Sequence, residues 1–174
     1  MDSNDSYYNN IANSYNSLYE EEQNLKLNLV FDKLRNTNFF ENINSILDIG
    51  CGTGVSSKFF INKGFDVFGI DPSDKLLEIG YSNGLDNNKF LKANAEKIPF
   101  EDNVFDLIIS FTAIQNFEDI EKGLKEIKRV GKNKFILTFL NGVKKSKEIE
   151  QIIKELFEVK INFIKKDNFF IIYN

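Results

Sequence analysis

A glycine-rich segment near residue 50 carries the residues best suited to bind a ligand. It runs Ile46-Leu47-Asp48-Ile49-Gly50-Cys51-Gly52-Thr53-Gly54, and a short apolar run leads into it. Glycines tolerate positive φ and let the backbone approach a ligand without a Cβ in the way. A turn of this kind at the carboxyl end of a buried strand is where open α/β sheets bind nucleotides. Taken alone, the pattern fits a plain tight turn between a strand and a helix equally well.

Three further polar blocks follow at regular intervals. Asp71 ends a second apolar run, 17 residues after Gly54, and a carboxylate there can accept hydrogen bonds from both hydroxyls of a ribose. Asn94-Ala95-Glu96 follow a third run, where an adenine ring would lie. Ile98-Pro99-Phe100 then lead through Asn103 into a strongly apolar stretch. Together these blocks favour a nucleotide-like ligand over a plain turn.

The elements that must position these blocks alternate between strand and helix. Glu21 to Arg35 has Leu25, Leu29 and Phe31 or Asp32 near helical spacing, which predicts a first helix. The remaining predicted strands are 45–49, 65–70, 89–93, 104–111 and 134–140, and the remaining predicted helices are 55–63, 73–81, 119–130 and 147–156. Two β-rich runs, 157–164 and 168–173, are joined by Lys165-Lys166-Asp167 and predict a hairpin. We therefore expect an α/β fold with a doubly wound, mostly parallel seven-stranded sheet and a C-terminal antiparallel hairpin.

In this order and spacing, the blocks resemble the class I S-adenosylmethionine-dependent methyltransferases, in particular the subgroup described as the methyltransferase domain 11 type. The resemblance covers roughly residues 7–140, and the tail hairpin fits the same fold. It implies the Rossmann-like methyltransferase fold and an enzyme that uses S-adenosylmethionine as its methyl donor. The product would be S-adenosylhomocysteine, and no metal would take part.

The resemblance also implies which residues bind the cofactor. Asp48 would support the methionine amine, directly or through water, and Asp71 would bind the ribose diol. The other cofactor-binding residues expected from the resemblance are Gly50, Cys51, Gly52, Gly54, Pro72, Ser73, Asn94, Ala95, Glu96 and Ser110.

Two departures from the family pattern affect the expected chemistry. Asn94 stands where the family often has Asp, and because an amide oxygen still accepts from an amine, we expect weakened adenine binding. Gln115-Asn116 stand where many relatives carry histidines, which removes the usual candidate base. The expected catalytic residues are therefore Tyr7, Tyr15 and Asn116. The two tyrosines belong to a segment that resembles one closing over the donor in many relatives, although an amphipathic helix packing its aromatics on the sheet fits equally well.

The length and composition of the chain limit its possible domain organisation. A length of 174 residues fits one compact domain, in which we expect residues 1–40 to form an N-terminal helical lid or cap and residues 41–174 the donor-binding domain. The chain has no apolar run of about 18 residues and no secretory signal, so we expect a cytoplasmic protein without a membrane partner. With one cysteine and no histidine, the chain also offers no structural zinc site.

The sequence favours methyl transfer to a small molecule, and two alternatives stay open. One is an enzyme that modifies RNA or a protein together with a small activating subunit. Residues 122–174 carry 13 basic and 6 acidic side chains, a net +7, which leaves room for an anionic partner. A solvated basic surface explains that charge as well, because no aromatic–basic RNA-binding motif accompanies it. The other alternative is a donor-binding module without catalysis, which the lack of histidine keeps open.

Overall fold

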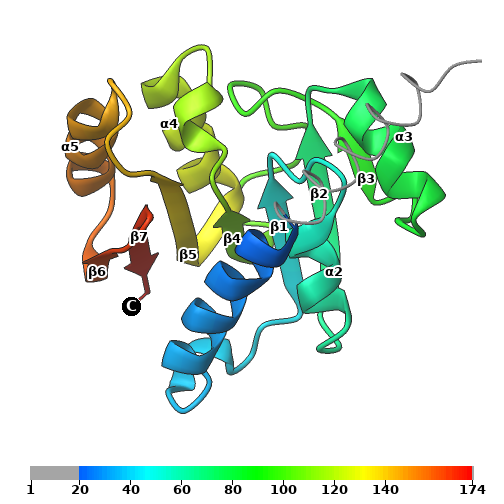
Figure 1. The fold of residues 1–174 in the computed structure, drawn as a ribbon, viewed down its shortest axis with the longest axis horizontal. Coiled ribbons are helices and arrows are strands. Elements are labelled where there is room, and N and C mark those ends of the chain that lie inside the picture. The colour runs from blue at the N-terminus through cyan, green and yellow to red at the C-terminus, as the bar shows by residue number, and fades with distance from the viewer. Residues whose placement is uncertain (1–19, 174) are drawn as a thin grey trace, which may run out of the picture.

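A computed structural model describes residues 20–173, whose strands form one seven-stranded sheet in the order β3-β2-β1-β4-β5-β7-β6 (Figure 1). The strands are β1 (Ser45–Ile49), β2 (Asp66–Asp71), β3 (Phe90–Lys92), β4 (Phe105–Ser110), β5 (Gly131–Leu140), β6 (Val159–Ile164) and β7 (Asp167–Ile172). Strands β1 to β5 pair in parallel, whereas β7 is antiparallel to both of its neighbours, β5 and β6. The predicted doubly wound sheet with a closing hairpin is confirmed.

Helices cover both faces of this sheet (Figure 1). They are a helix over 20–34, α2 (Val55–Ile61), α3 (Asp74–Ser82), α4 (Ile120–Val130) and α5 (Ser146–Leu156), with short 3₁₀ turns η1 (Asn38–Phe40) and η2 (Ile114–Asn116). Two apolar clusters fill the two interfaces: one contains the buried residues of α4 and α5, the other those of the helix 20–34, α2 and α3. Because strands buried on both faces need apolar residues on both, the central strands are mostly apolar.

Local sequence explains where the helices near the ligand-binding edge begin. Ser73 caps α3 by accepting a hydrogen bond from Leu76 N at 3.3 Å. Asp119 caps α4 in the same way, accepting from Lys122 N at 3.0 Å. The apolar residues of α4 at helical spacing, Ile120, Leu124 and Ile127, are buried. These caps fix the helices whose first turns face the carboxyl ends of the strands.

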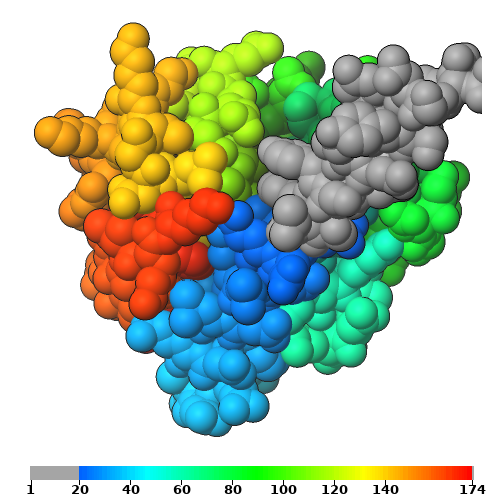
Figure 2. All heavy atoms as spheres, viewed as in Figure 1, coloured from blue at the N-terminus to red at the C-terminus, as the bar shows by residue number. Residues whose placement is uncertain are grey.

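The predicted first helix is present over 20–34, but the leucines whose spacing predicted it do not mark its buried face. Leu25 is 67% exposed and Leu29 is 38% exposed. The residues that face the sheet are instead Gln23, Lys26, Leu27, Val30 and Leu34. Apolar residues occur at helical spacing on two faces of this helix. The face that is buried has the less regular apolar pattern, because it includes the polar residues Gln23 and Lys26. Figure 2 shows this helix in blue between the red C-terminal hairpin and the green-cyan region of α2.

The helix 20–34 is packed into the main body of the fold. Its residues Leu27, Val30 and Leu34 belong to the same apolar cluster as Ile46 of β1 and Phe60 of α2. The proposed boundary at residue 40 between a lid and a donor-binding domain stays a prediction. Tyr7 and Tyr15 lie outside the described residues. Over the described residues, every helix is too short or too polar to cross a bilayer.

Candidate active site

The glycine turn after β1 needs its glycines for conformation and for space. Gly50, Gly52 and Gly54 have φ values of 75°, 54° and 86°, a region that side-chain-bearing residues rarely adopt. A Cβ added to Gly50 would lie 2.5 Å from the Cβ of Ala113. The backbone N–H groups of Gly50 and Cys51 both donate to the carbonyl of Ile70 in β2, at 2.8 and 3.1 Å. The turn is therefore held against β2 and lies close to the loop after β4.

Asp71, the last residue of β2, is oriented by the turn and by the start of α3. Its Oδ2 accepts from Gly52 N and its Oδ1 accepts from Ser73 N, each at 2.9 Å. The residue is only 6% exposed, and it lines a cavity. Because each carboxylate oxygen has more than one acceptor position, both oxygens can still accept a hydrogen bond from a ligand. The arrangement suits a pair of neighbouring hydroxyl groups.

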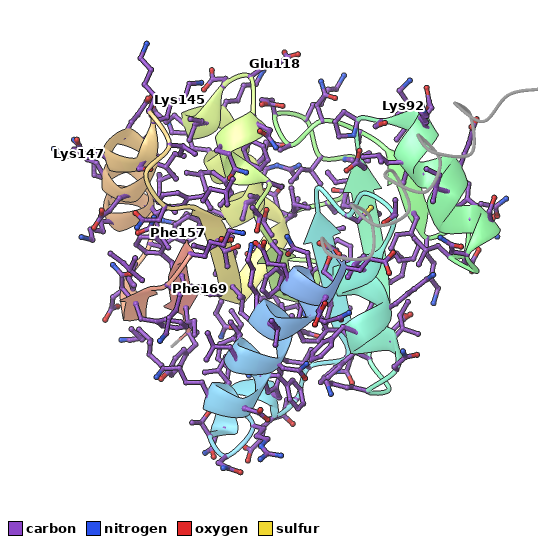
Figure 3. All side chains as sticks on the ribbon, viewed as in Figure 1. Lys92, Glu118, Lys145, Lys147, Phe157 and Phe169 are labelled. Atoms are coloured by element: carbon purple, nitrogen blue, oxygen red, sulfur yellow. The ribbon has the colours of Figure 1, made fainter. Side chains whose placement is uncertain are left out.

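This cavity, which we call the first cavity, lies at the carboxyl ends of β1 to β4 and has a volume of about 360 Å³. Its size falls in the usual range of small-molecule sites, and its position beside β1 and β4 is where the strand order reverses. Its lining residues are Ile49, Gly50, Gly52, Ile70, Asp71, Pro72, Ser73, Leu76, Ala93, Asn94, Ala95, Glu96, Phe111, Thr112, Ala113, Asn116, Phe117 and Glu118. Figure 3 shows Glu118 at the edge of the molecule between α3 and α4.

Most of the residues expected to bind the cofactor meet in the first cavity. From the predicted set, the structure brings together Gly50, Gly52, Asp71, Pro72, Ser73, Asn94, Ala95 and Glu96, together with the catalytic candidate Asn116. Leu76 also lines it and was not predicted. No motif marks this apolar residue, so only the fold could place it.

Asp48 does not line the first cavity. It is fully buried beneath the turn, where its Oδ2 accepts from the hydroxyls of Ser56 and Ser57 at 2.5 and 2.6 Å. Burial raises the pKa of its carboxyl to about 6, despite the two hydroxyl donors. The first residues of α2 thus bond one oxygen of this carboxylate, whereas its Oδ1 is buried without a partner among the described residues. The expected support of the methionine amine by Asp48, directly or through water, stays a prediction.

Two other predicted residues, Ser110 and Gly54, also do not line the first cavity. Ser110 is buried, and its hydroxyl donates to the carbonyl of Ile49 at 3.0 Å, which ties β4 to β1. Gly54 caps α2, and a Cβ added to it would lie 2.5 Å from a methyl group of Leu85. These positions support the shape of the turn and do not border the first cavity.

Cys51 borders a second cavity on the other side of the glycine turn. This second cavity has a volume of about 450 Å³ and is lined by Glu20, Gln23, Gly50, Cys51, Gly52, Thr53, Val55, Ser56, Leu76, Ile79, Asn83 and Phe111. Cys51 is 4% exposed, and burial raises the pKa of its thiol well above its usual range. Its sulfur therefore stays protonated and serves as a small apolar group.

A buried polar network, which no sequence motif indicates, supports the loop after β4. Thr112 has a φ of 57°, which is unusual for a β-branched residue, and it lines the first cavity. Its hydroxyl donates to Asp167 at 2.6 Å and accepts from Lys26 at 3.2 Å. Its N–H donates to the hydroxyl of Thr138 at 2.8 Å. The surrounding contacts thus hold a strained residue at the edge of the cavity.

A second network holds the segment that follows Asn94-Ala95-Glu96. The guanidinium of Arg129 pairs with Glu126 at 2.7 Å and donates to the carbonyls of Ile98 and Phe100 at 3.0 and 2.8 Å. Glu126 in turn accepts from Ile98 N at 3.0 Å. The sequence alone showed only two charges on a predicted helix, because these partners lie far away along the chain.

Comparison with known proteins places the chain in a family. Residues 47–139 match the family described as methyltransferase domain. A protein of Methanocaldococcus jannaschii, named uncharacterized protein MJ1252, is 32% identical over 164 residues, which cover 92% of this chain and 61% of that protein. A demethylmenaquinone methyltransferase of Clavibacter sepedonicus is 37% identical over 87 residues, which cover 49% of this chain and 36% of that protein. This chain therefore spans less than two thirds of the length of either relative.

A solved structure shares the fold of this chain. The crystal structure of the PH0226 protein from Pyrococcus horikoshii superimposes with a TM-score of 0.72 at 21% identity, covering 88% of this chain and 90% of that one. The chain belongs to the methyltransferase domain family and so to the class I S-adenosylmethionine-dependent methyltransferases.

Proposed function

We propose that this chain binds S-adenosylmethionine in the first cavity and transfers its methyl group to a small molecule. The observation that carries the proposal is the buried carboxylate of Asp71, oriented by Gly52 N and Ser73 N toward a cavity of ligand size. Two neighbouring ribose hydroxyls can donate to its two oxygens. The left-handed turn at Gly50 and Gly52 lets backbone approach the same ligand.

The residues around Asp71 suit an adenosine. Pro72 and Leu76 on one side and Ala95 on another offer apolar contacts for an adenine ring. Asn94 adds an amide whose oxygen can accept from the adenine amine, or whose nitrogen can donate to a ring nitrogen.

Bound S-adenosylmethionine supplies a methyl group on a positively charged sulfur, a good leaving group. The residues of the chain then have to align donor and acceptor and exclude water. Asn116 lines the first cavity and can orient an acceptor by hydrogen bonding, but it cannot act as a strong base. Catalytic roles for Tyr7 and Tyr15 stay predictions.

A small acceptor is supported by the lining of the cavities and by a relative. Among the described residues that line the first and second cavities, none is Lys or Arg, so these spaces do not favour a phosphate-rich acceptor. Lys145 and Lys147, part of the basic C-terminal third, extend outward from the start of α5 (Figure 3). The relative named demethylmenaquinone methyltransferase also favours a small, partly apolar acceptor.

Transfer of a radiolabelled methyl group into a cell extract tests the proposal. We expect labelled product in the small-molecule fraction, and none when the protein has been heat-inactivated. Label in RNA or protein would support the first alternative, and adding candidate small subunits would then test the need for a partner. Binding of the donor without transfer into any fraction would support a non-catalytic module.

A further inference from the structure

The second cavity contains a buried amide that has no partner. Gln23, on the sheet-facing side of the helix 20–34, lines this cavity and is 4% exposed. Its Nε2 is the one buried side-chain nitrogen in residues 20–173 that lacks a hydrogen-bond partner. Burying an amide N–H without an acceptor is unfavourable, so such a group commonly marks a place for a ligand oxygen or a water.

The second cavity continues the first. The two spaces share four lining residues, Gly50, Gly52, Leu76 and Phe111. Asp71 borders only the first cavity, whereas Gln23 borders only the second. A ligand whose ribose lies at Asp71 and whose chain runs along the glycine turn therefore reaches the second cavity with its far end.

We propose that Gln23 Nε2 donates a hydrogen bond to the carboxylate at the amino-acid end of the methyl donor. This inference rests on the proposed function, because it assumes that the adenosine end lies in the first cavity. The second cavity then holds the amino-acid end, and Gln23 is a ligand-binding residue outside the motifs of the family.

The charges around the second cavity match an amino acid that carries both an ammonium and a carboxylate. None of its described lining residues is Lys or Arg, so a neutral donor has to meet the carboxylate. Ser56 also lines it, but its hydroxyl already donates to Asp48 at 2.5 Å. Glu20 provides an exposed carboxylate in the same lining, which can pair with the ammonium.

Two ligands that differ only at the amino-acid end test this assignment. S-adenosylhomocysteine carries that end, whereas 5′-methylthioadenosine keeps the adenosine and the thioether without it. Calorimetry measures the affinity of both for the whole wild-type chain, for Gln23→Leu and for the control Gln151→Leu. Gln151 lies exposed on α5, where it bonds only to Glu155 at 2.8 Å.

Gln23→Leu should weaken binding of S-adenosylhomocysteine by about 10- to 100-fold, the loss typical of a hydrogen bond to a charged group. Binding of 5′-methylthioadenosine should change by less than about twofold, and Gln151→Leu should change neither. The thermal midpoint of Gln23→Leu should equal or exceed that of the wild type, because leucine leaves no unpaired amide.

Unchanged affinity of Gln23→Leu for S-adenosylhomocysteine would overturn the inference, and so would an equal loss for both ligands. The inference would also be overturned if Gln23→Leu lost methyl transfer but kept its affinity for both ligands. In that case the amide of Gln23 would bind the acceptor and not the donor. Wild-type protein that binds neither ligand would contradict the proposed function itself.

Discussion

Lys26 in the helix 20–34 and Asp167 at the start of β7 form a buried ion pair, with Nζ 2.9 Å from Oδ1. Asp167 is fully buried, and Lys26 also pairs with Glu22 at 3.0 Å. Both charged groups touch the hydroxyl of Thr112, which lines the first cavity. The ion pair therefore joins the first helix, the closing hairpin and the ligand-binding loop in one network.

Replacing Asp167 by alanine should lower the free energy of unfolding by about 3–5 kcal/mol, because it leaves the Lys26 ammonium buried without its main partner. Chemical denaturation at neutral pH measures this loss. As a control, Glu150→Ala breaks an exposed pair with Lys154 on α5 and should cost no more than about 0.5 kcal/mol. A loss below about 1 kcal/mol for Asp167→Ala would show that the pair does not link these elements.

The raised pKa of Asp48, about 6 against an ordinary 3.8, makes stability depend on pH. Between these values the folded chain keeps a proton that the unfolded chain releases. Stability therefore falls as pH rises through this window, by about 3 kcal/mol in all, and levels off above it.

Asp48→Asn removes this titration. Denaturation of both proteins at intervals from pH 4 to 8 should show the wild type losing stability relative to the variant up to about pH 6, and a constant difference above it. The difference in unfolding free energy between wild type and variant cancels the contributions of other titrating groups. One of these is Asp106, whose pKa is lowered to about 2 by Lys132 and two backbone N–H donors. If the unfolding free energies of the two proteins differ by the same amount at every pH, the raised pKa of Asp48 is contradicted.

Gly50→Ala and Gly64→Ala separate backbone strain from lack of space. Both glycines have positive φ, 75° and 90°, so each substitution should cost about 1–2 kcal/mol through strain. At Gly50 the new Cβ also meets Ala113 at 2.5 Å, whereas nothing lies within 4 Å at Gly64. The Gly50 variant should lose about 1–3 kcal/mol more.

The Gly50 variant should also bind S-adenosylhomocysteine more weakly, because its turn must move away from Ala113. The Gly64 variant should bind it like the wild type. Denaturation and calorimetry on the two proteins give both comparisons. Equal stability losses, or equal affinities, would mean that the close approach at Gly50 does not shape the site.

The fold and the adenosine side of the site followed from local patterns in the sequence. Strands such as β1 are buried on both faces, so their apolar runs stand out, and the glycine turn with Asp71 sits at predicted strand ends. The predicted starts of α3 and α4 lie at Ser73 and Asp119, whose caps depend only on residues three positions away.

The rest depended on contacts between distant segments. Asp167 was assigned to the connection between the hairpin strands, yet it begins β7 and pairs with Lys26 inside the fold. The spacing of Leu25 and Leu29 does not reveal the buried face of the first helix, because two of the buried residues, Gln23 and Lys26, are polar and have roles that only the tertiary structure reveals. The role of Asp48 toward the ligand, taken from the resemblance, stays a prediction, and its bonds to the two serines that begin α2 could be seen only in the structure.

The central claim is that Asp71 and the turn at Gly52 hold the adenosyl group of a methyl donor. Calorimetric titration of S-adenosylhomocysteine into wild type, Asp71→Asn and Asp71→Ala measures it most directly. We expect binding by the wild type, a loss of about 10-fold for the asparagine variant, which keeps one acceptor oxygen, and of about 100-fold or more for the alanine variant. Equal affinity in all three folded proteins, or no binding by the wild type at millimolar ligand, would contradict the account.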